Sequence, residues 1–94
     1  MRLRHIPGSE QQIAESPYVI GNPEEKKAHW ADVFGNENPV HIEVGMGKGK
    51  FLMELAGMHP DINYVGIERY STVLLKAIRK QEALKLPNLF FLRE

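Results

Sequence analysis

The segment from Val40 to Gly49 constrains this chain most, because glycine recurs at every second position directly after a short apolar run. The run over residues 40–44 has the length and composition of a buried strand. Gly45, Gly47 and Gly49 then form a tight turn, and apolar residues beyond it recur at helical spacing. A strand, a glycine turn and a helix in this order open nucleotide-binding α/β folds, where glycine lets the backbone approach a ligand. The helix that follows turns its unpaired N–H groups toward that ligand.

The spacing of the glycines separates two classes of ligand. A dinucleotide site usually reads G-x-G-x-x-G, whereas residues 43–49 read E-x-G-x-G-x-G. This variant, with an acid two residues before the first glycine, resembles motif I of the class I S-adenosylmethionine-dependent methyltransferases. Taken alone, the pattern also fits a turn that only reverses the chain.

A second acid strengthens the interpretation as a ligand site. The apolar run at residues 64–67 ends in Glu68, and an acid at the end of the second strand can accept hydrogen bonds from two ribose hydroxyls. The alternative is a solvated glutamate at the end of a strand. The residues predicted to bind a cofactor are Glu43, Gly45, Gly47, Gly49 and Glu68.

The remaining pattern predicts an α/β fold with parallel strands. Asn22 and Pro23 indicate a helix start, and Gly35 ends that helix. Strands over 40–44, 63–67 and 89–92 alternate with helices over 49–58 and after Ser71, which is placed as an N-cap. The order β-α-β-α-β with apolar strands predicts a sheet covered on both faces, with strand order 3-2-1. Residues 1–22 are predicted to form an arm with little regular structure, and residues 23–94 the folded domain.

Composition excludes several functions. The chain has 94 residues, enough for one small domain, and its formal net charge of zero gives no reason to expect a nucleic-acid partner. It has no cysteine, which excludes disulfides and thiolate chemistry and fits a reducing cytosol. Its four histidines are widely spaced, so no metal site is predicted. No apolar run reaches the roughly 18 residues of a membrane span.

The residues resemble those of one family, the bacterial tRNA (guanine-N(7)-)-methyltransferases. The resemblance covers nearly the whole chain, beginning with RLRH at residues 2–5. Its most specific parts are FGNENPVHIEVGMGKG at residues 34–49 and PDINYVGIE at residues 60–68. Glycine loops alone are shared by many methyltransferases.

The resemblance implies a Rossmann-like class I methyltransferase fold, of which β-α-β-α-β is the first half. It implies transfer of a methyl group from S-adenosyl-L-methionine to ring nitrogen 7 of a guanine in tRNA, in the cytoplasm. Glu43 and the loop from Gly45 to Gly49 would line the amino-acid and ribose portions of the cofactor, and Glu68 would hold the ribose hydroxyls. The basic residues at positions 2–5 would contact tRNA or remain a solvated terminus.

The sequence departs from the family in one large respect. The family's later segment, an aspartate-proline-tryptophan core followed by basic residues, is absent here, so no catalytic residue is assigned. We therefore expect a fragment or a truncated product that is inactive alone. A non-catalytic nucleoside- or partner-binding module is the alternative, while the glycine spacing disfavours a nicotinamide-dependent dehydrogenase. The first strand would form an uncovered apolar edge, through which the chain is expected to self-associate.

Overall fold

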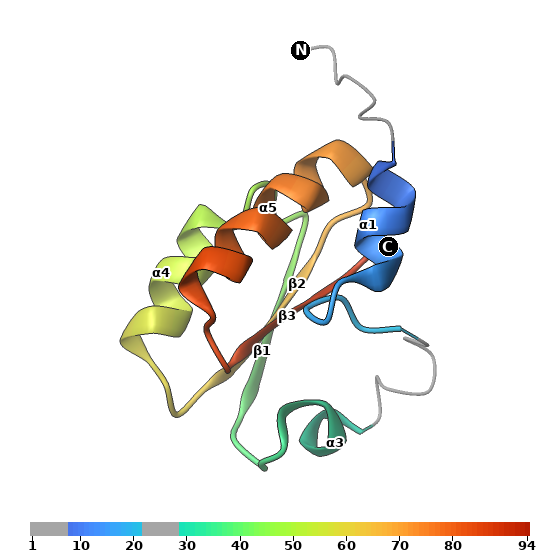
Figure 1. The fold of residues 1–94 in the computed structure, drawn as a ribbon. Coiled ribbons are helices and arrows are strands. Elements are labelled where there is room, and N and C mark those ends of the chain that lie inside the picture. Colours follow the sequence, from blue (N-terminus) through green and yellow to red (C-terminus); the bar gives the residue numbers. More distant parts are fainter. Residues whose placement is uncertain (1–7, 22–28) are drawn as a thin grey trace.

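The computed structural model describes residues 8–21 and 29–94 (Figure 1). Within these ranges, helices and strands alternate as the sequence predicts from residue 40 onward. The elements are α1 (Ser9–Glu15), α3 (Trp30–Phe34), β1 (Val40–Val44), α4 (Lys50–Met58), β2 (Asn63–Ile67), α5 (Ser71–Leu84) and β3 (Leu89–Leu92).

The three strands form one parallel sheet in the order β1-β2-β3. Val40 pairs with Asn63, and Tyr64 pairs with Leu89, so the strands run in close register. Both crossover helices, α4 and α5, lie on the same side of the sheet (Figure 1), as right-handed connections in this strand order require. The predicted strands, their direction and their order are confirmed.

The main core lies between the sheet and these two helices. Its largest fully buried residues belong to β2, α5 and β3, and include Tyr64, Leu74 and Phe91. Burial of each such side chain contributes about 1.5–3 kcal/mol, so this layer supplies most of the apolar stabilisation. Asn88, which directly precedes β3, holds the connection between α4 and β2 against this core. Its side-chain amide donates to the main-chain carbonyls of Ala56, His59 and Ile62 at 2.9–3.0 Å.

The second face of the sheet is covered only in part. Val65 and Leu92 are fully buried there, beside the buried Ile20, and partly buried apolar residues of α3 pack against them. In contrast, Ile42 and Val44 of β1 are 50% and 78% exposed. The helix α3 is too short to cover the whole of β1: its five residues span about 7 Å, whereas the five residues of β1 span about 16 Å. The prediction of cover on both faces is therefore confirmed at the sheet centre and wrong for β1 within the described residues.

The predicted lack of regular structure before residue 22 is wrong for residues 9–15, which form α1. This helix packs on α5 (Figure 1) through Ile13, which is buried in the main core. An ion pair between Glu10 and Arg93 joins it to the end of β3. A seven-residue helix with one buried apolar side chain shows too little periodicity to be found from sequence.

The segment after α1 covers the outer edge of β3. Ile20 N–H donates to Phe91 C=O, and Phe91 N–H donates to Tyr18 C=O, each at 2.8 Å. Of the two edges of the three-stranded sheet, the one formed by β3 is thus bonded to a neighbouring segment.

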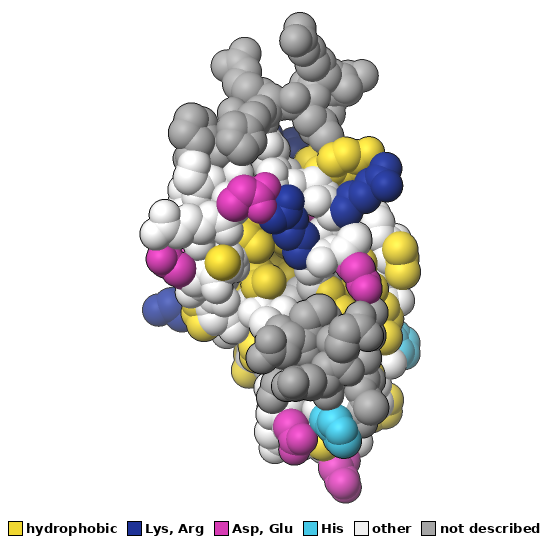
Figure 2. All heavy atoms as spheres, turned by 90° about the vertical axis from the view of Figure 1, so that its right-hand side faces the viewer, with side chains coloured by type: hydrophobic (Ala, Val, Ile, Leu, Met, Phe, Trp, Pro, Cys, Tyr) yellow, Lys and Arg dark blue, Asp and Glu magenta, His cyan; other side chains and the backbone are white. Residues whose placement is uncertain are grey.

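Figure 2 shows the face to the right in Figure 1, where acidic and basic side chains of the described residues are interspersed.

Two helix boundaries test the predicted capping. Gly35 ends α3 in the left-handed conformation at φ 76°, as predicted, while the proposed helix start at Asn22 and Pro23 lies outside the described residues. The N-cap of α5 is Tyr70, and Ser71 is its first helical residue, so the predicted N-cap is one residue too late. Neither α3 nor α5 has a side-chain hydrogen bond at its N-cap.

Candidate functional site

The glycine loop connects the carboxyl end of β1 to α4. Gly45, Gly47 and Gly49 have φ values of 70°, 63° and 76°, a region that other residues rarely adopt. A β-carbon at Gly45 or Gly47 would meet no heavy atom within 4 Å. The backbone at these two positions is therefore open to a close approach by a ligand.

The loop is held against β2 by its own backbone. Gly45 N–H and Met46 N–H both donate to Ile67 C=O, at 2.8 and 3.1 Å. Met46 folds back over Gly66 of β2, where a β-carbon would lie 2.2 Å from the Met46 sulfur. Glycine at position 66 thus makes room for the methionine that anchors the loop.

Glu68 closes the loop from the other strand. Its Oε1 accepts from Gly47 N–H at 3.0 Å, and its Oε2 accepts from Tyr70 N–H at 3.1 Å. The residue is only 7% exposed. Each carboxylate oxygen has a second lone pair, so the group that fixes the loop can also accept hydrogen bonds from a ligand.

A cavity of about 430 Å³ opens at this end of the sheet. Its volume lies in the range of small-molecule sites, about 300–1,000 Å³. It lies beyond the carboxyl ends of the parallel strands, where α/β folds bind their ligands. The lining residues are Val44, Gly45, Ile67, Glu68, Arg69, Tyr70 and Glu94.

The predicted residues are distributed unequally around this cavity. Gly45 and Glu68 line it, and Gly47 is bonded to Glu68. Gly49 is buried instead, with its α-carbon facing Met53 and Ala77. Glu43 is half-buried in β1, on the opposite face of the strand from Val44. A role in cofactor binding stays a prediction for all five.

Two lining residues that sequence reasoning missed are Arg69 and Tyr70. The Arg69 guanidinium lies 4.9 Å from the centre of the Tyr70 ring, and its Nη2 donates to the Tyr70 hydroxyl at 2.8 Å. This hydrogen bond, with the electrostatic influence of Tyr70 and then Glu68, raises the pKa of Arg69 above its ordinary value. Their position directly after Glu68, the acid that follows β2, is a sequence signal that could have identified them.

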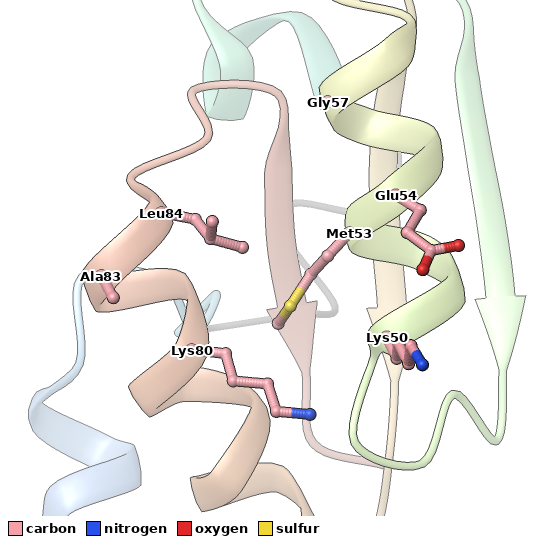
Figure 3. A pocket seen from close by; sticks show the side chains of 7 residues that line it. All are labelled: Lys50, Met53, Glu54, Gly57, Lys80, Ala83 and Leu84. Atoms are coloured by element: carbon pink, nitrogen blue, oxygen red, sulfur yellow. The ribbon is translucent and has the colours of Figure 1, made fainter.

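A second cavity, of about 620 Å³, lies between α4 and α5 (Figure 3). Met53, Lys80 and Leu84 point into it from the two helices (Figure 3). None of the predicted cofactor-binding residues lines it.

In the described ranges, 8–21 and 29–94, no group of three or more potential metal ligands converges. The helices of the same ranges are too short or too polar to cross a membrane.

Comparison with known proteins identifies the class. Residues 37–94 match a family model described as "Putative methyltransferase", and the chain belongs to this methyltransferase family. Two crystal structures of the antibiotic-resistance methyltransferase Kmr share the fold, with TM-scores of 0.56 and 0.54 at 24% identity. They cover 72% and 81% of this chain, which corresponds to 37% and 36% of theirs.

Curated relatives are more similar in sequence. The tRNA (guanine-N(7)-)-methyltransferase of Lachnoclostridium phytofermentans is 59% identical over 99% of this chain. The enzyme of the same name from Bacillus cytotoxicus is 51% identical over 95% of this chain. The chain spans 44% and 42% of the length of these two proteins. The resemblance noted from the sequence is confirmed.

Proposed function

We propose that this chain is the cofactor-binding part of a tRNA (guanine-N(7)-)-methyltransferase and that it takes S-adenosyl-L-methionine. One observation carries the proposal. Glu68 joins the glycine loop of β1 to the end of β2 through Gly47 N–H and lines the cavity at that edge. The glycine loop and Glu68, the two sequence features that point to a nucleoside cofactor, are thus in direct contact.

The residues present fit this cofactor. The open space beside Gly45 and Gly47 admits a ligand against the backbone, and Gly45 and Glu68 line one cavity. The N-terminus of α4, which has no side-chain cap, lies just beyond the loop and presents unpaired N–H groups. These features supply acceptors for ribose hydroxyls and donors for a carboxylate.

The chain's own residues have binding and positioning roles in this proposal. The Glu68 carboxylate accepts from the two ribose hydroxyls while its bonds to Gly47 and Tyr70 hold it in place. Gly45 and Gly47 let the amino-acid portion approach the loop. The bound cofactor supplies a methyl group already activated on a sulfonium, so positioning dominates the chemistry. No residue of this chain is proposed as catalytic.

Transfer RNA as the substrate belongs to the same proposal and comes from the names of the relatives. The charges give it no separate support, because the net charge is zero and acids and bases are mixed on the face in Figure 2. The predicted contacts of Arg2, Arg4 and His5 with tRNA lie outside the described residues. The cytoplasmic location expected from the resemblance is likewise part of the proposal.

Isothermal titration calorimetry tests the cofactor assignment. S-adenosylmethionine and its demethylated product should bind, and NAD should neither bind nor compete. Glu68→Ala should lose about 1.5–3 kcal/mol of binding free energy, as for a hydrogen bond to a charged group. Glu82→Ala, which removes an exposed acid of α5, should bind as the parent does. Binding of NAD without S-adenosylmethionine would reverse the assignment.

A further inference from the structure

The cavity between α4 and α5 is a groove whose two walls are helices (Figure 3). α5 packs closely on α1, whereas α4 and α5 are not among the closely packed pairs of elements. Gly57 and Ala83 have too little side chain to fill the space between them. Each helix contributes one stripe at three- and four-residue spacing, Lys50, Met53, Glu54 and Gly57 from α4 and Lys80, Ala83 and Leu84 from α5.

The charged side chains give this groove a direction. Both helices connect strands of one parallel sheet and so run the same way, and Lys50 and Lys80 come first in their stripes. Lys80 extends toward α4, while the Glu54 carboxylate points away from α5 (Figure 3). Neither ammonium has an ion pair with a described residue. The groove therefore has a cationic end and, at Gly57 and Leu84, an apolar end.

The floor and the apolar end offer a surface to a ligand. Met53 is 6% exposed, and Leu84, which points into the groove, is 54% exposed (Figure 3). Small-molecule sites have volumes of about 300–1,000 Å³, mostly apolar walls and a few polar groups that fix orientation. The groove meets each criterion, with a volume of about 620 Å³ and two lysines.

We propose that the groove between α4 and α5 binds a small anionic amphiphile, a molecule with one carboxylate or phosphate on an apolar chain. The anionic group lies between the ammonium groups of Lys50 and Lys80, and the chain lies on Met53 and extends toward Leu84. Lysine suits this role, because its ammonium donates three hydrogen bonds while its stem lies along apolar surface. No residue lines both this groove and the cavity at the carboxyl edge, so the two proposals are independent.

The dimensions of the groove favour a small molecule over a macromolecule. Residues 50–57 of α4 rise about 10 Å along the helix axis, and residues 80–84 of α5 rise about 6 Å. A stable protein interface has about 20–30 residues on each side, whereas seven residues line the groove. A nucleic-acid strand needs cations spaced along its backbone, and here both lysines lie at one end.

Both walls of the groove belong to complete crossover units. α4 connects β1 to β2, and α5 connects β2 to β3. A doubly wound sheet continues beyond its first strand, which here is the side of α4 away from α5. Elements added there form neither wall of the groove, so the site does not depend on the uncovered edge of β1.

Titration with octanoate below its micelle concentration, followed in ¹H–¹⁵N spectra, tests the site. The largest saturable shifts should occur at Met53, Ala83 and Leu84. Gly49 should also shift, because a β-carbon there would lie 3.3 Å from the Met53 methyl. Octyl phosphate should bind at the same residues, and the tighter of the two anions identifies the head group. No saturable shift at these residues with either anion would overturn the proposal.

The cationic end is tested by removing one charge from the ligand or from the protein. 1-Octanol, the uncharged analogue, should bind at least threefold more weakly than octanoate. Lys80→Gln should weaken octanoate binding about threefold and leave octanol binding unchanged. Lys76→Gln is the control, because Lys76 is an exposed lysine of α5 outside the groove. Equal affinities for octanoate and octanol, or equal effects of the two variants, would contradict the role of the lysines.

Filling the groove tests its apolar part. Ala83→Phe places a ring in the space between the helices and should abolish binding of octanoate and of octanol. Glu82→Phe places the same ring at the neighbouring exposed position of α5, outside the groove, and should bind as the parent does. Circular dichroism melting establishes that both variants fold. Parent affinity in a folded Ala83→Phe variant would overturn the proposal.

Discussion

Replacement of Glu68 by alanine should destabilise the fold as well as the site. The substitution leaves Gly47 N–H and Tyr70 N–H without their acceptor, and each hydrogen bond to a charged group is worth about 1.5–3 kcal/mol. The carboxylate is buried, while Tyr70 is exposed, so water can replace one of the two bonds more readily. We therefore expect a loss of about 2–4 kcal/mol, which lowers Tm by roughly 10–20 °C for a domain of this size.

Urea unfolding followed by circular dichroism measures this loss without any ligand. Glu68→Gln should lose less, because its amide retains one acceptor oxygen for one of the two N–H groups. Glu54→Ala, on the exposed surface of α4, should change the free energy of unfolding by no more than about 0.5 kcal/mol. A stability of Glu68→Ala within that same margin of the parent would refute the view that Glu68 fixes the glycine loop.

Four other substitutions test three separate features. Gly66→Ala should lose about 1–3 kcal/mol of stability in the same urea assay, because a β-carbon there meets Met46 and Leu52; Gly57→Ala, in open space within α4, should be neutral or stabilising. Gly45→Val and Gly47→Val should abolish calorimetric binding of S-adenosylmethionine, since both positions have positive φ and face the ligand side; full affinity in both would show that the loop is only a turn. Gln81→Leu should lose about 2–4 kcal/mol by thermal melting, because this buried amide bonds Leu86 and Leu89 at the turn into β3; an unchanged Tm would count against that role.

The sheet could be predicted because its signals are local. Each strand is a short, largely apolar run with proline or asparagine at its start, namely Pro39, Asn63 and Asn88, and the predicted residues of β1, β2 and β3 agree with those observed. Strand order followed from the handedness of crossovers. The helix α1 was missed because its contact with α5 is long-range, and Ile13 is its only buried apolar residue among the described ones.

The candidate site was predictable by residue type and less so by geometry. The glycine spacing and the acid at position 68 located the carboxyl edge of the sheet. Sequence could not show that Gly49 packs against Ala77 while Gly45 stays open, because the two differ only in which neighbour comes close after folding. The pairing of Arg69 with Tyr70 likewise depends on the direction the chain takes after β2.

The position of the cofactor site is the central claim, and nuclear magnetic resonance tests it most directly. In ¹H–¹⁵N spectra of the chain titrated with S-adenosylhomocysteine, the largest amide shifts should occur at Gly45, Gly47 and Glu68, around the cavity at the carboxyl edge of the sheet. Largest shifts at Met53 and Ala83, which line the cavity between α4 and α5, or no shifts at millimolar ligand, would contradict the account.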